Sequence, residues 1–360
     1  MASEQPTGSV LVTGAGGVIG SHVVEAYAAR PGWTVRAVSR RRPAYLDGLG
    51  TAEHLPVDLS DADAARVGLA AAADTTHLVF AAYAEQPDLA AQVAPNVALL
   101  RNTLDGLAAA GAPLRHVTLY QGGKAYGAHL GHMKTPARED DPRLMPPNFY
   151  YDQEDLLRAV AAERGFEVTM LRPEAVIGYA VGNPMNLLMV IAVYAAVSRE
   201  LGLPLRFPGT FAAYDAMYQV TDAELLARAT VWAGEEPRAA GHVFNVTNGD
   251  QLRWRHLFPV FARHFGMDYA EPQPISLVQH MADKEPLWRR MAERHGLVDT
   301  PWEHLVGWAF GDFLFASGFD NVSSTIKVRK AGFADCYDTQ DRFLERFDDL
   351  VARRVVPPFR

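Results

Sequence analysis

The stretch Val10-Leu-Val-Thr-Gly-Ala-Gly-Gly-Val-Ile-Gly-Ser-His-Val-Val24 decides the fold of this chain. Residues 10–13 form a short apolar and β-branched run, as in a buried parallel strand. Residues 21–29 favour a helix, with apolar side chains recurring on one side. The turn between the two is rich in glycine: Gly14, Gly16, Gly17 and Gly20. A strand, a glycine turn and a helix in this order are typical of a dinucleotide-binding unit.

Each glycine of this turn has an expected role. We expect Gly14 to permit the sharp turn, Gly17 to let the backbone approach a diphosphate, and Gly20 to let the helix pack closely on the strand. The N–H groups at the start of the helix would bind the phosphates. The predicted cofactor-binding residues are therefore Gly14, Gly16, Gly17, Val18, Ile19 and Gly20. A purely structural glycine turn is the alternative, which the flanking strand and helix make weaker.

The end of the second predicted strand, 34–38, indicates which dinucleotide binds. An NAD site usually places Asp or Glu here, on the ribose 2′-hydroxyl. This chain instead continues with Ser39-Arg40-Arg41-Arg42. A guanidinium pairs well with a 2′-phosphate, so we predict NADP(H), bound by Ser39, Arg40 and Arg41. A solvated basic turn is the alternative interpretation.

The composition excludes several classes of function. A net charge of −8 over 360 residues argues against broad nucleic-acid binding and against anchoring to anionic membranes. Cys336 is the single cysteine, which rules out a disulfide within the chain and a cysteine metal cluster. No apolar run approaches a membrane span of ~20 residues, and the N-terminus lacks a signal region. We expect a cytoplasmic protein.

Strands and helices alternate in the first third of the chain, and the strict alternation fades after residue 200. Strands are predicted at 76–83, 114–119, 167–171 and 242–246, and helices at 96–110, 149–164, 186–201 and 221–233. This alternation predicts an α/β fold with a Rossmann-type, doubly wound parallel sheet. We assign residues 1–180 to the NADP-binding domain, whose core also uses about 210–250. Residues 181–360 form a smaller, mostly helical part for the substrate, with further helices at 255–265, 287–295 and 339–353 and an aromatic-rich segment at 307–319.

Two further segments carry candidate site residues. The loop Asp58-Leu-Ser-Asp61 precedes a helix, and such a loop lies over the adenine in sheets of this type. Asp58 is therefore a candidate adenine contact, whereas a plain helix cap at Ser60 or Asp61 is the alternative. The segment 120–148 breaks the alternation and reads as a long, functional loop. We also predict cofactor contacts at Leu59, Ala82, Tyr151, Val176 and Met185.

The usual catalytic pair of short-chain dehydrogenases, Tyr-x-x-x-Lys on one helix, is absent. Tyr150 and Tyr151 are the obvious tyrosines, but Glu154 and Asp155 follow them four residues later. A carboxylate cannot supply the positive charge that favours a tyrosinate. Lys124 follows the strand that ends at residue 119, and this strand end faces the nicotinamide in the predicted fold. The lysine would therefore reach the site from a different element than the tyrosine.

At these residues the chain resembles the progesterone 5β-reductase/iridoid synthase family, which are atypical extended short-chain reductases. The matching motifs include Val12-Thr-Gly-Ala-Gly-Gly-Val-Ile-Gly20, Ser39-Arg-Arg41, Gly122-Gly-Lys-Ala-Tyr126, Asn148-Phe-Tyr-Tyr-Asp-Gln-Glu-Asp155 and Phe244-Asn-Val-Thr-Asn-Gly-Asp250. The resemblance covers nearly the whole chain. It implies that Tyr151 and Lys124 are the catalytic residues.

The resemblance also implies a reaction, the reduction of the C=C bond of an α,β-unsaturated carbonyl compound by NADPH. A hydride would reach the β-carbon, and the Tyr151 hydroxyl, supported by Lys124, would stabilise the enolate oxygen. The chain departs from the family pattern at Tyr120-Gln121-Gly122, Lys124-Ala125-Tyr126, Gly127-Ala-His-Leu and Ala81-Ala-Tyr-Ala84. These segments surround the nicotinamide and the substrate, so the substrate stays open.

Other functions stay open at this point. The same scaffold can reduce C=O bonds or act on sugar nucleotides, and a non-catalytic NADP(H)-sensing protein is a third interpretation. In that last case Tyr151 would be a structural tyrosine at the start of a helix, and Lys124 would be a solvated lysine in a loop. We expect no metal site, because the spacing of His129, His132, Asp140 and Asp141 matches no known pattern. The expected partner is a small unsaturated carbonyl compound. A homodimer is common for this fold, but no feature of the sequence requires it.

Overall fold

Seven parallel strands form the central sheet. The computed structural model describes residues 7–180, 182 and 185–359. The strand order is β3-β2-β1-β4-β5-β6-β9, so the order reverses between β1 and β4, as in a doubly wound Rossmann sheet. The strands are β1 Gly8–Thr13, β2 Trp33–Val38, β3 Ala52–Leu55, β4 His77–Phe80, β5 His116–Tyr120, β6 Glu167–Pro173 and β9 Val243–Val246. The predicted fold class is confirmed.

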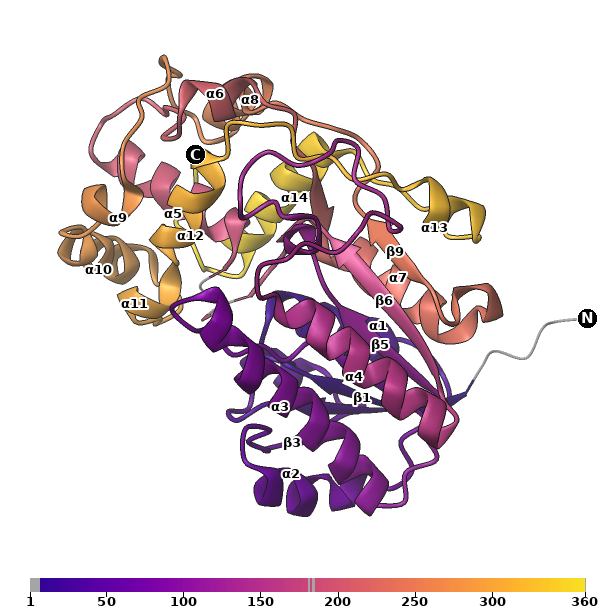
Figure 1. Cartoon of the computed structure of the whole chain (residues 1–360). Coiled ribbons are helices and arrows are strands. Elements are labelled where there is room, and N and C mark those ends of the chain that lie inside the picture. The colour runs from indigo at the N-terminus through magenta and orange to yellow at the C-terminus, as the bar shows by residue number, and fades with distance from the viewer. Residues whose placement is uncertain (1–6, 181, 183–184, 360) are drawn as a thin grey trace, which may run out of the picture.

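Helices cover both faces of this sheet. One face packs against α1 Val18–Ala28 and α7 Ala223–Glu235, and the other against α2 Ala62–Gly68, α3 Leu89–Ala109 and α4 Phe149–Arg164. Figure 1 shows α3 and α4 side by side across the second face. The side chains of β1 alternate accordingly, since Val10 and Val12 join one apolar cluster and Leu11 the other.

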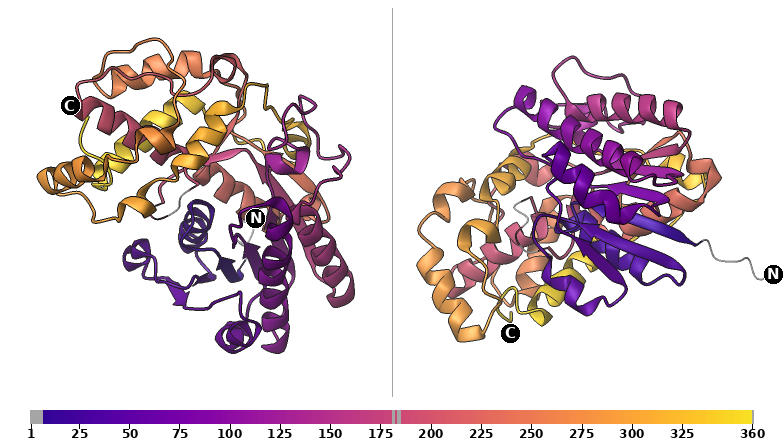
Figure 2. Two further views of the ribbon diagram at one scale, coloured as in Figure 1. Left: turned by 60° about the vertical axis from the view of Figure 1, so that its left-hand side comes forward. Right: turned by 90° about the horizontal axis from the view of Figure 1, so that it is seen from below.

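The C-terminal part is built around a buried helix, α5 Leu187–Glu200. Its residues 187–198 are all buried, because helices of the C-terminal part enclose it. These helices gather beyond one end of the sheet (Figures 1 and 2). They are α6 Phe211–Asp215, α8 Trp254–His264, α9 Leu277–His280, α10 Glu285–His295, α11 Trp302–Leu305, α12 Trp308–Ala316 and α14 Thr339–Ala352.

Shorter elements complete the chain. A two-stranded parallel sheet pairs β7 Ala175–Ile177 with β8 Val220–Asp222, and α13 Ile326–Lys330 contacts β9. The 3-10 helices are η1 Ala44–Gly48, η2 Leu69–Ala72, η3 Gly123–Tyr126 and η4 Pro237–Ala239. None of the described helices is long and apolar enough to cross a membrane.

Some predicted boundaries were wrong. Helix α3 begins at Leu89, seven residues before the predicted start, and includes Pro95. Proline in a helix interior removes a backbone donor, so the pattern placed the start after it. The Asp88 side chain caps the helix by accepting from Ala91 N at 2.8 Å, and contacts with α2 and α4 hold it in place. Strand β3 was not predicted, because Ala-Glu-His-Leu lacks a β-branched pattern.

Candidate active site

The candidate site lies at the edge of the sheet where the parallel strands end. The turn at Gly14 follows β1, Ala81 follows β4, Gln121 follows β5 and Glu174 follows β6. In open parallel sheets, ligands bind outside these carboxyl ends, at the point where the strand order reverses. The topology therefore brings the predicted cofactor and catalytic segments to one edge.

Steric contacts explain two glycines of the first turn. Gly14 has a φ of +63°, and a Cβ there would lie 2.4 Å from the Ala81 carbonyl oxygen. A Cβ on Gly20 would lie 2.3 Å from the Gly14 carbonyl oxygen, so only glycine lets α1 approach the turn this closely. These two contacts match the turn and packing roles expected from the sequence.

The other two glycines leave room for a ligand. Gly16 is exposed, and a Cβ there would meet only the Pro43 side chain, at 3.8 Å. Gly17 is the N-cap of α1 and offers no side-chain cap, so the first N–H groups of the helix keep their hydrogen-bonding capacity. Helix α1 begins at Val18 rather than at Ser21, which places Val18 and Ile19 in its first turn. An open backbone cradle at a helix N-terminus fits a diphosphate.

The arginines after β2 differ in their contacts. Arg42 donates to Asp47 at 3.2 Å, whereas Arg40 and Arg41 are exposed and form no ion pair within residues 7–180, 182 and 185–359. The Ser39 hydroxyl donates to the Arg41 carbonyl oxygen at 2.7 Å and so fixes the turn. Arg40 and Arg41 are therefore the arginines available to a phosphate.

The loop Asp58–Asp61, which the sequence predicts to lie over the adenine, uses its two acidic residues in different ways. Asp61 caps α2 by accepting from Ala64 N at 2.9 Å, which fulfils the cap role left open by the sequence. Asp58 is exposed and accepts from the backbone N and the hydroxyl of Ser60, and these bonds lower the pKa of Asp58. The Asp58 carboxylate therefore orders the loop while staying at the surface.

The remaining predicted cofactor contacts lie on several elements. The Leu59 side chain is buried, and its carbonyl oxygen accepts from Asn102 Nδ2 at 2.9 Å. Ala82 N donates to the Thr13 hydroxyl at 3.2 Å, which ties the end of β4 to the end of β1. Val176 lies on β7, and Met185 precedes α5. These roles in cofactor binding stay predictions.

Lys124 lies in the tight turn η3 directly after β5. It is partly buried, and burial lowers the pKa of its amine, a shift that the charge of Glu85 opposes. The amine forms no hydrogen bond or ion pair in the described part of the chain. Asn148, the N-cap of α4, donates to the Lys124 carbonyl oxygen at 2.8 Å. This bond ties the lysine turn to the start of the helix that carries the tyrosines.

The Tyr151 hydroxyl is engaged by backbone groups. It donates to the Ala125 carbonyl oxygen at 2.8 Å and accepts from Leu144 N at 3.2 Å. The ring is buried, with the Arg143 guanidinium carbon 5.0 Å from its centre. Tyr151 thus connects the lysine turn to the far end of the long loop, and its hydroxyl already has a donor and an acceptor.

Tyr150 presents its hydroxyl to the strand ends instead. A Cβ on Gly122 would lie 3.4 Å from the Tyr150 hydroxyl oxygen. Burial, together with the nearby Tyr83 and Glu174, raises the pKa of Tyr150. The hydroxyl has no hydrogen-bond partner among the described residues. The family resemblance points to Tyr151 rather than Tyr150, whereas the two adjacent positions on the helix send their hydroxyl groups in different directions.

A buried polar network supports the start of α4. Gln121 Nε2 donates to Glu154 Oε2 and to the Tyr150 carbonyl oxygen, both at 3.1 Å. Arg172 Nε donates to Gln121 Oε1 at 2.6 Å, and its Nη1 donates to the Tyr126 hydroxyl at 3.0 Å. The Glu154 carboxylate, four residues after Tyr150, is therefore bound by Gln121 after β5 and lies 3.7 Å from Arg172 Nη2 on β6. Satisfied buried networks of this kind fix one geometry.

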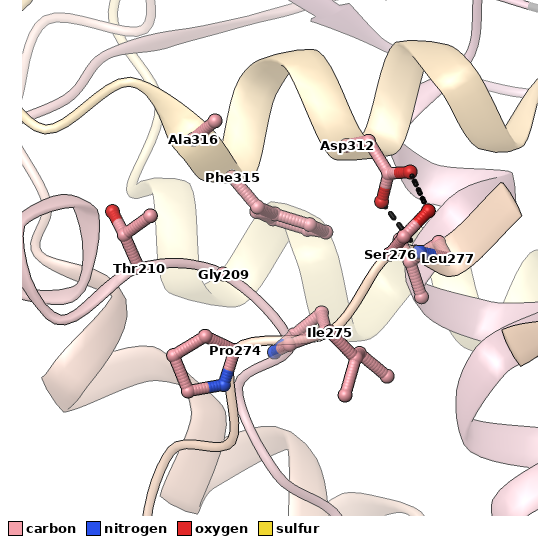
Figure 3. A pocket seen from close by; sticks show the side chains of 10 residues that line it. Gly209, Thr210, Pro274, Ile275, Ser276, Leu277, Asp312, Phe315 and Ala316 are labelled. Atoms are coloured by element: carbon pink, nitrogen blue, oxygen red, sulfur yellow. Dashed lines mark hydrogen bonds between the residues drawn. The ribbon is translucent and has the colours of Figure 1, made fainter. Parts of the chain in front are cut away.

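A separate cavity lies in the C-terminal part (Figure 3). It measures about 250 Å³, and Pro274, Ile275 and Phe315 contribute apolar walls. Its one carboxylate, Asp312, accepts from Ser276 Oγ at 2.8 Å and from Leu277 N at 2.6 Å, as Figure 3 shows. No residue of the glycine turn, the lysine turn or α4 lines it. The cavity is therefore separate from the candidate chemistry.

Several solved structures share the fold of this chain at low sequence identity. The UDP-glucose 4-epimerase of Thermotoga maritima has a TM-score of 0.67 at 16% identity, covering 94% of this chain and 97% of its own. The Bordetella bronchiseptica enzyme WbmG, solved in complex with NAD, has a TM-score of 0.68 at 16% identity over 99% and 98%. At such identities the likeness shows the fold.

Sequence relatives are closer. The chain is 34% identical to the (S)-8-oxocitronellyl enol synthase CYC2 of Camptotheca acuminata, over 96% of this chain and 93% of that protein. It is 29% identical to the 3-oxo-Delta(4,5)-steroid 5-beta-reductase of Arabidopsis thaliana, over 96% and 92%. Residues 58–357 match the model of the PRISE-like Rossmann-fold domain. This chain therefore belongs to the PRISE-like Rossmann-fold family.

Proposed function

We propose that this protein reduces the C=C bond of α,β-unsaturated carbonyl compounds with NADPH. The observation that carries the proposal is the pairing of the Lys124 turn with the start of α4, through Asn148 and Tyr151. A lysine amine without a partner in the described chain and a tyrosine hydroxyl thus reach the end of β5 from two different elements. The names of the relatives support the same substrate class, since one is a 3-oxo-Delta(4,5)-steroid reductase.

The chemistry follows from where charge develops. NADPH supplies the hydride that reaches the β-carbon of the substrate. Negative charge then develops on the carbonyl oxygen, where hydrogen-bond donors act most strongly in the transition state. Lys124 contributes a cation whose partial burial strengthens its field.

Two tyrosines compete for the role of hydroxyl donor. Tyr151 is the prediction from the family resemblance, and its two hydrogen bonds to the backbone would have to open before it could donate to a substrate. Tyr150 has an unoccupied hydroxyl at the strand ends and needs no such change. We therefore propose Lys124 with one hydroxyl of this pair as the oxyanion-binding set, and the geometry favours Tyr150.

The choice of NADPH over NADH rests on the turn after β2. Arg40 and Arg41 are exposed and without an ion pair in the described chain, while no carboxylate occupies the positions from 39 to 42. A 2′-phosphate would accept from both guanidinium groups. The glycine turn would bind the diphosphate, because its open backbone and uncapped helix start fit that group.

The test is an assay of NADPH consumption with a cyclic enone, an enal, a steroid enone and a saturated aldehyde. Gas chromatography with mass spectrometry, calibrated with authentic saturated carbonyl and allylic alcohol standards, separates C=C from C=O reduction. Saturated carbonyl or enol products, with the saturated aldehyde inert, are the expected result. Alcohol products would replace the proposal with carbonyl reduction, and tight NADPH binding without turnover of any compound would favour a sensing role.

A further inference from the structure

Glu174 is a buried carboxylic acid at the candidate site that the sequence patterns did not single out. It follows β6 directly, and its side chain is buried. Asn321 Nδ2 donates to its Oε2 at 3.0 Å, and the Ser323 hydroxyl donates to its Oε1 at 2.9 Å. Both donors are themselves buried. The segment before α13 thus holds this carboxyl in one orientation.

The carboxyl faces the glycine pair between β5 and the lysine turn. A Cβ on Gly123 would lie 2.8 Å from Glu174 Oε2, and a Cβ on Gly122 would lie 3.4 Å from the Tyr150 hydroxyl. Glu174 therefore occupies the space that a side chain at position 123 would fill, and the Tyr150 hydroxyl lies at van der Waals distance from position 122. In its ionised form Glu174 raises the pKa of Tyr150, which agrees with this proximity.

The surroundings of Glu174 favour its protonated form. Burial raises the pKa of its carboxyl to about 7, against the hydrogen bonds from Ser323 and Asn321, which lower it. Glu174 forms no ion pair with any residue that the structure describes, since the adjacent Arg172 donates to Gln121 and Tyr126. The ionisable side chains that respond to its charge are Tyr150 of α4 and Tyr218 before β8.

We propose that Glu174 is the acid that protonates the α-carbon of the enolate, so that this enzyme releases a saturated carbonyl compound. This inference rests on the proposed function. The O–H bond of Glu174 breaks, a C–H bond forms at the α-carbon from the enolate electron pair, and the C=O bond re-forms. The resulting carboxylate regains its proton from water. With the hydride on the β-carbon, one hydride and one proton complete the reduction.

The step matters because an enolate can leave a site in two forms. Protonation on oxygen gives an enol, and protonation on the α-carbon gives the saturated carbonyl compound. Several relatives are named enol synthases, whereas another is named a 5-beta-reductase. An acid held beside the α-carbon, as proposed for Glu174, directs the proton to carbon and so favours the saturated carbonyl product, because general acid catalysis contributes about 10²–10⁴ in rate.

The experiment uses the whole protein, NADPH and a cyclic enone with a methyl group on the α-carbon, in deuterated water. The product is sampled early, before spontaneous exchange, and the configuration at the deuterated α-carbon is measured by chiral chromatography. The wild type is expected to give one configuration. Glu174→Gln is expected to keep consuming NADPH but to give both configurations, with free enol detected by NMR, because protonation then occurs in water about 10²-fold or more slower than in the site.

The controls separate this proposal from the proposed function. Glu139→Gln is the matched control, because burial also raises the pKa of the Glu139 carboxyl, but this carboxyl accepts a hydrogen bond from Asn245 N. The Glu139→Gln protein should therefore still give one configuration. A mixture from the wild type, or one configuration from a folded Glu174→Gln protein, would overturn the role of Glu174 while leaving enone reduction in place. Absence of NADPH consumption by the wild type with every enone would instead refute the proposed function. If circular dichroism shows that the Glu174→Gln protein does not fold, the wild type and Glu174→Asp, which keeps a carboxylic acid, are compared instead. A mixture of configurations at the α-carbon from either protein would overturn the proposal.

Discussion

The turn after β1 and the region after β5 lie at the same edge of the sheet, but they are built in different ways. In the first, Gly14, Ala81 and Gly20 fix the geometry through contacts of backbone with backbone. In the second, side chains far apart in the sequence meet: Gln121 with Glu154, Tyr126 with Arg172, and Glu174 with Asn321. The comparison teaches that the region proposed to bind the cofactor depends on the absence of side chains, whereas the region proposed for catalysis depends on which side chains meet.

Gly14→Ala should have the largest effect, because it combines backbone strain with a collision. At a φ of +63° the new Cβ would lie 2.4 Å from the Ala81 carbonyl oxygen. Strain and overpacking together are expected to cost about 4 kcal/mol in the free energy of unfolding. Gly16→Ala is the matched control, since its Cβ would meet only Pro43 at 3.8 Å. Urea unfolding of both variants measures the difference, and equal stability losses would contradict this account of the turn.

The tyrosines test the second region. If Tyr150 is the hydroxyl donor, Tyr150→Phe should lower kcat by about 10²–10³, because one oxyanion donor is lost. Tyr151→Phe should then act mainly on stability, by about 1 kcal/mol for each lost hydrogen bond to the backbone. Initial rates with an enone and urea unfolding of both variants distinguish these effects. The reverse pattern would assign the donor role to Tyr151, as the family resemblance predicts.

Glu174 should make stability depend on pH. Its pKa lies near 7 in the folded protein against an ordinary value of 4.5, so between these values the folded state holds a proton that the unfolded state has lost. The free energy of unfolding should therefore fall as pH rises from about 4.5 to 7, by about 3 kcal/mol, and stay level above. Glu174→Gln cannot ionise and should lack this component. Urea unfolding of both proteins at pH 5 and pH 7.5 measures it, and parallel pH profiles would show that Glu174 does not titrate in this range.

The smallest expected effect concerns the exposed arginines. Removing Arg40 or Arg41 should weaken NADPH binding about 10- to 150-fold, because a charge-assisted hydrogen bond to the 2′-phosphate contributes about 1.5–3 kcal/mol. NADH binding should change little. Arg42→Ala is the control, since Arg42 already pairs with Asp47. Fluorescence titration with both dinucleotides measures the ratio, and an equal loss for NADH would assign the arginines a role other than phosphate recognition.

Much of the fold could be predicted from the sequence alone. The glycine turn, the alternation of strands and helices and the arginines after β2 are local patterns, and each has a local physical cause. The start of α3 could not be predicted, because the cap at Asp88 and the packing of α2 and α4 outweigh the cost of Pro95. Strand β3 was missed for a similar reason, since its place at the sheet edge comes from pairing with β2.

The candidate site divides along the same line. The sequence by itself determined a Rossmann-type α/β protein with a dinucleotide turn. It also placed Lys124 after the end of β5, and the family resemblance pointed to Tyr151 as its catalytic partner. Only the tertiary structure decided that the Tyr151 hydroxyl binds the backbone of the long loop while the Tyr150 hydroxyl faces Gly122. It also decided that Glu174 lies beside this glycine pair. The side chain of Glu174 is held there by Asn321 and Ser323, which follow it in the chain by 147 and 149 positions. Local patterns encode the direction of the backbone, but which side chains share a buried space depends on how distant segments pack.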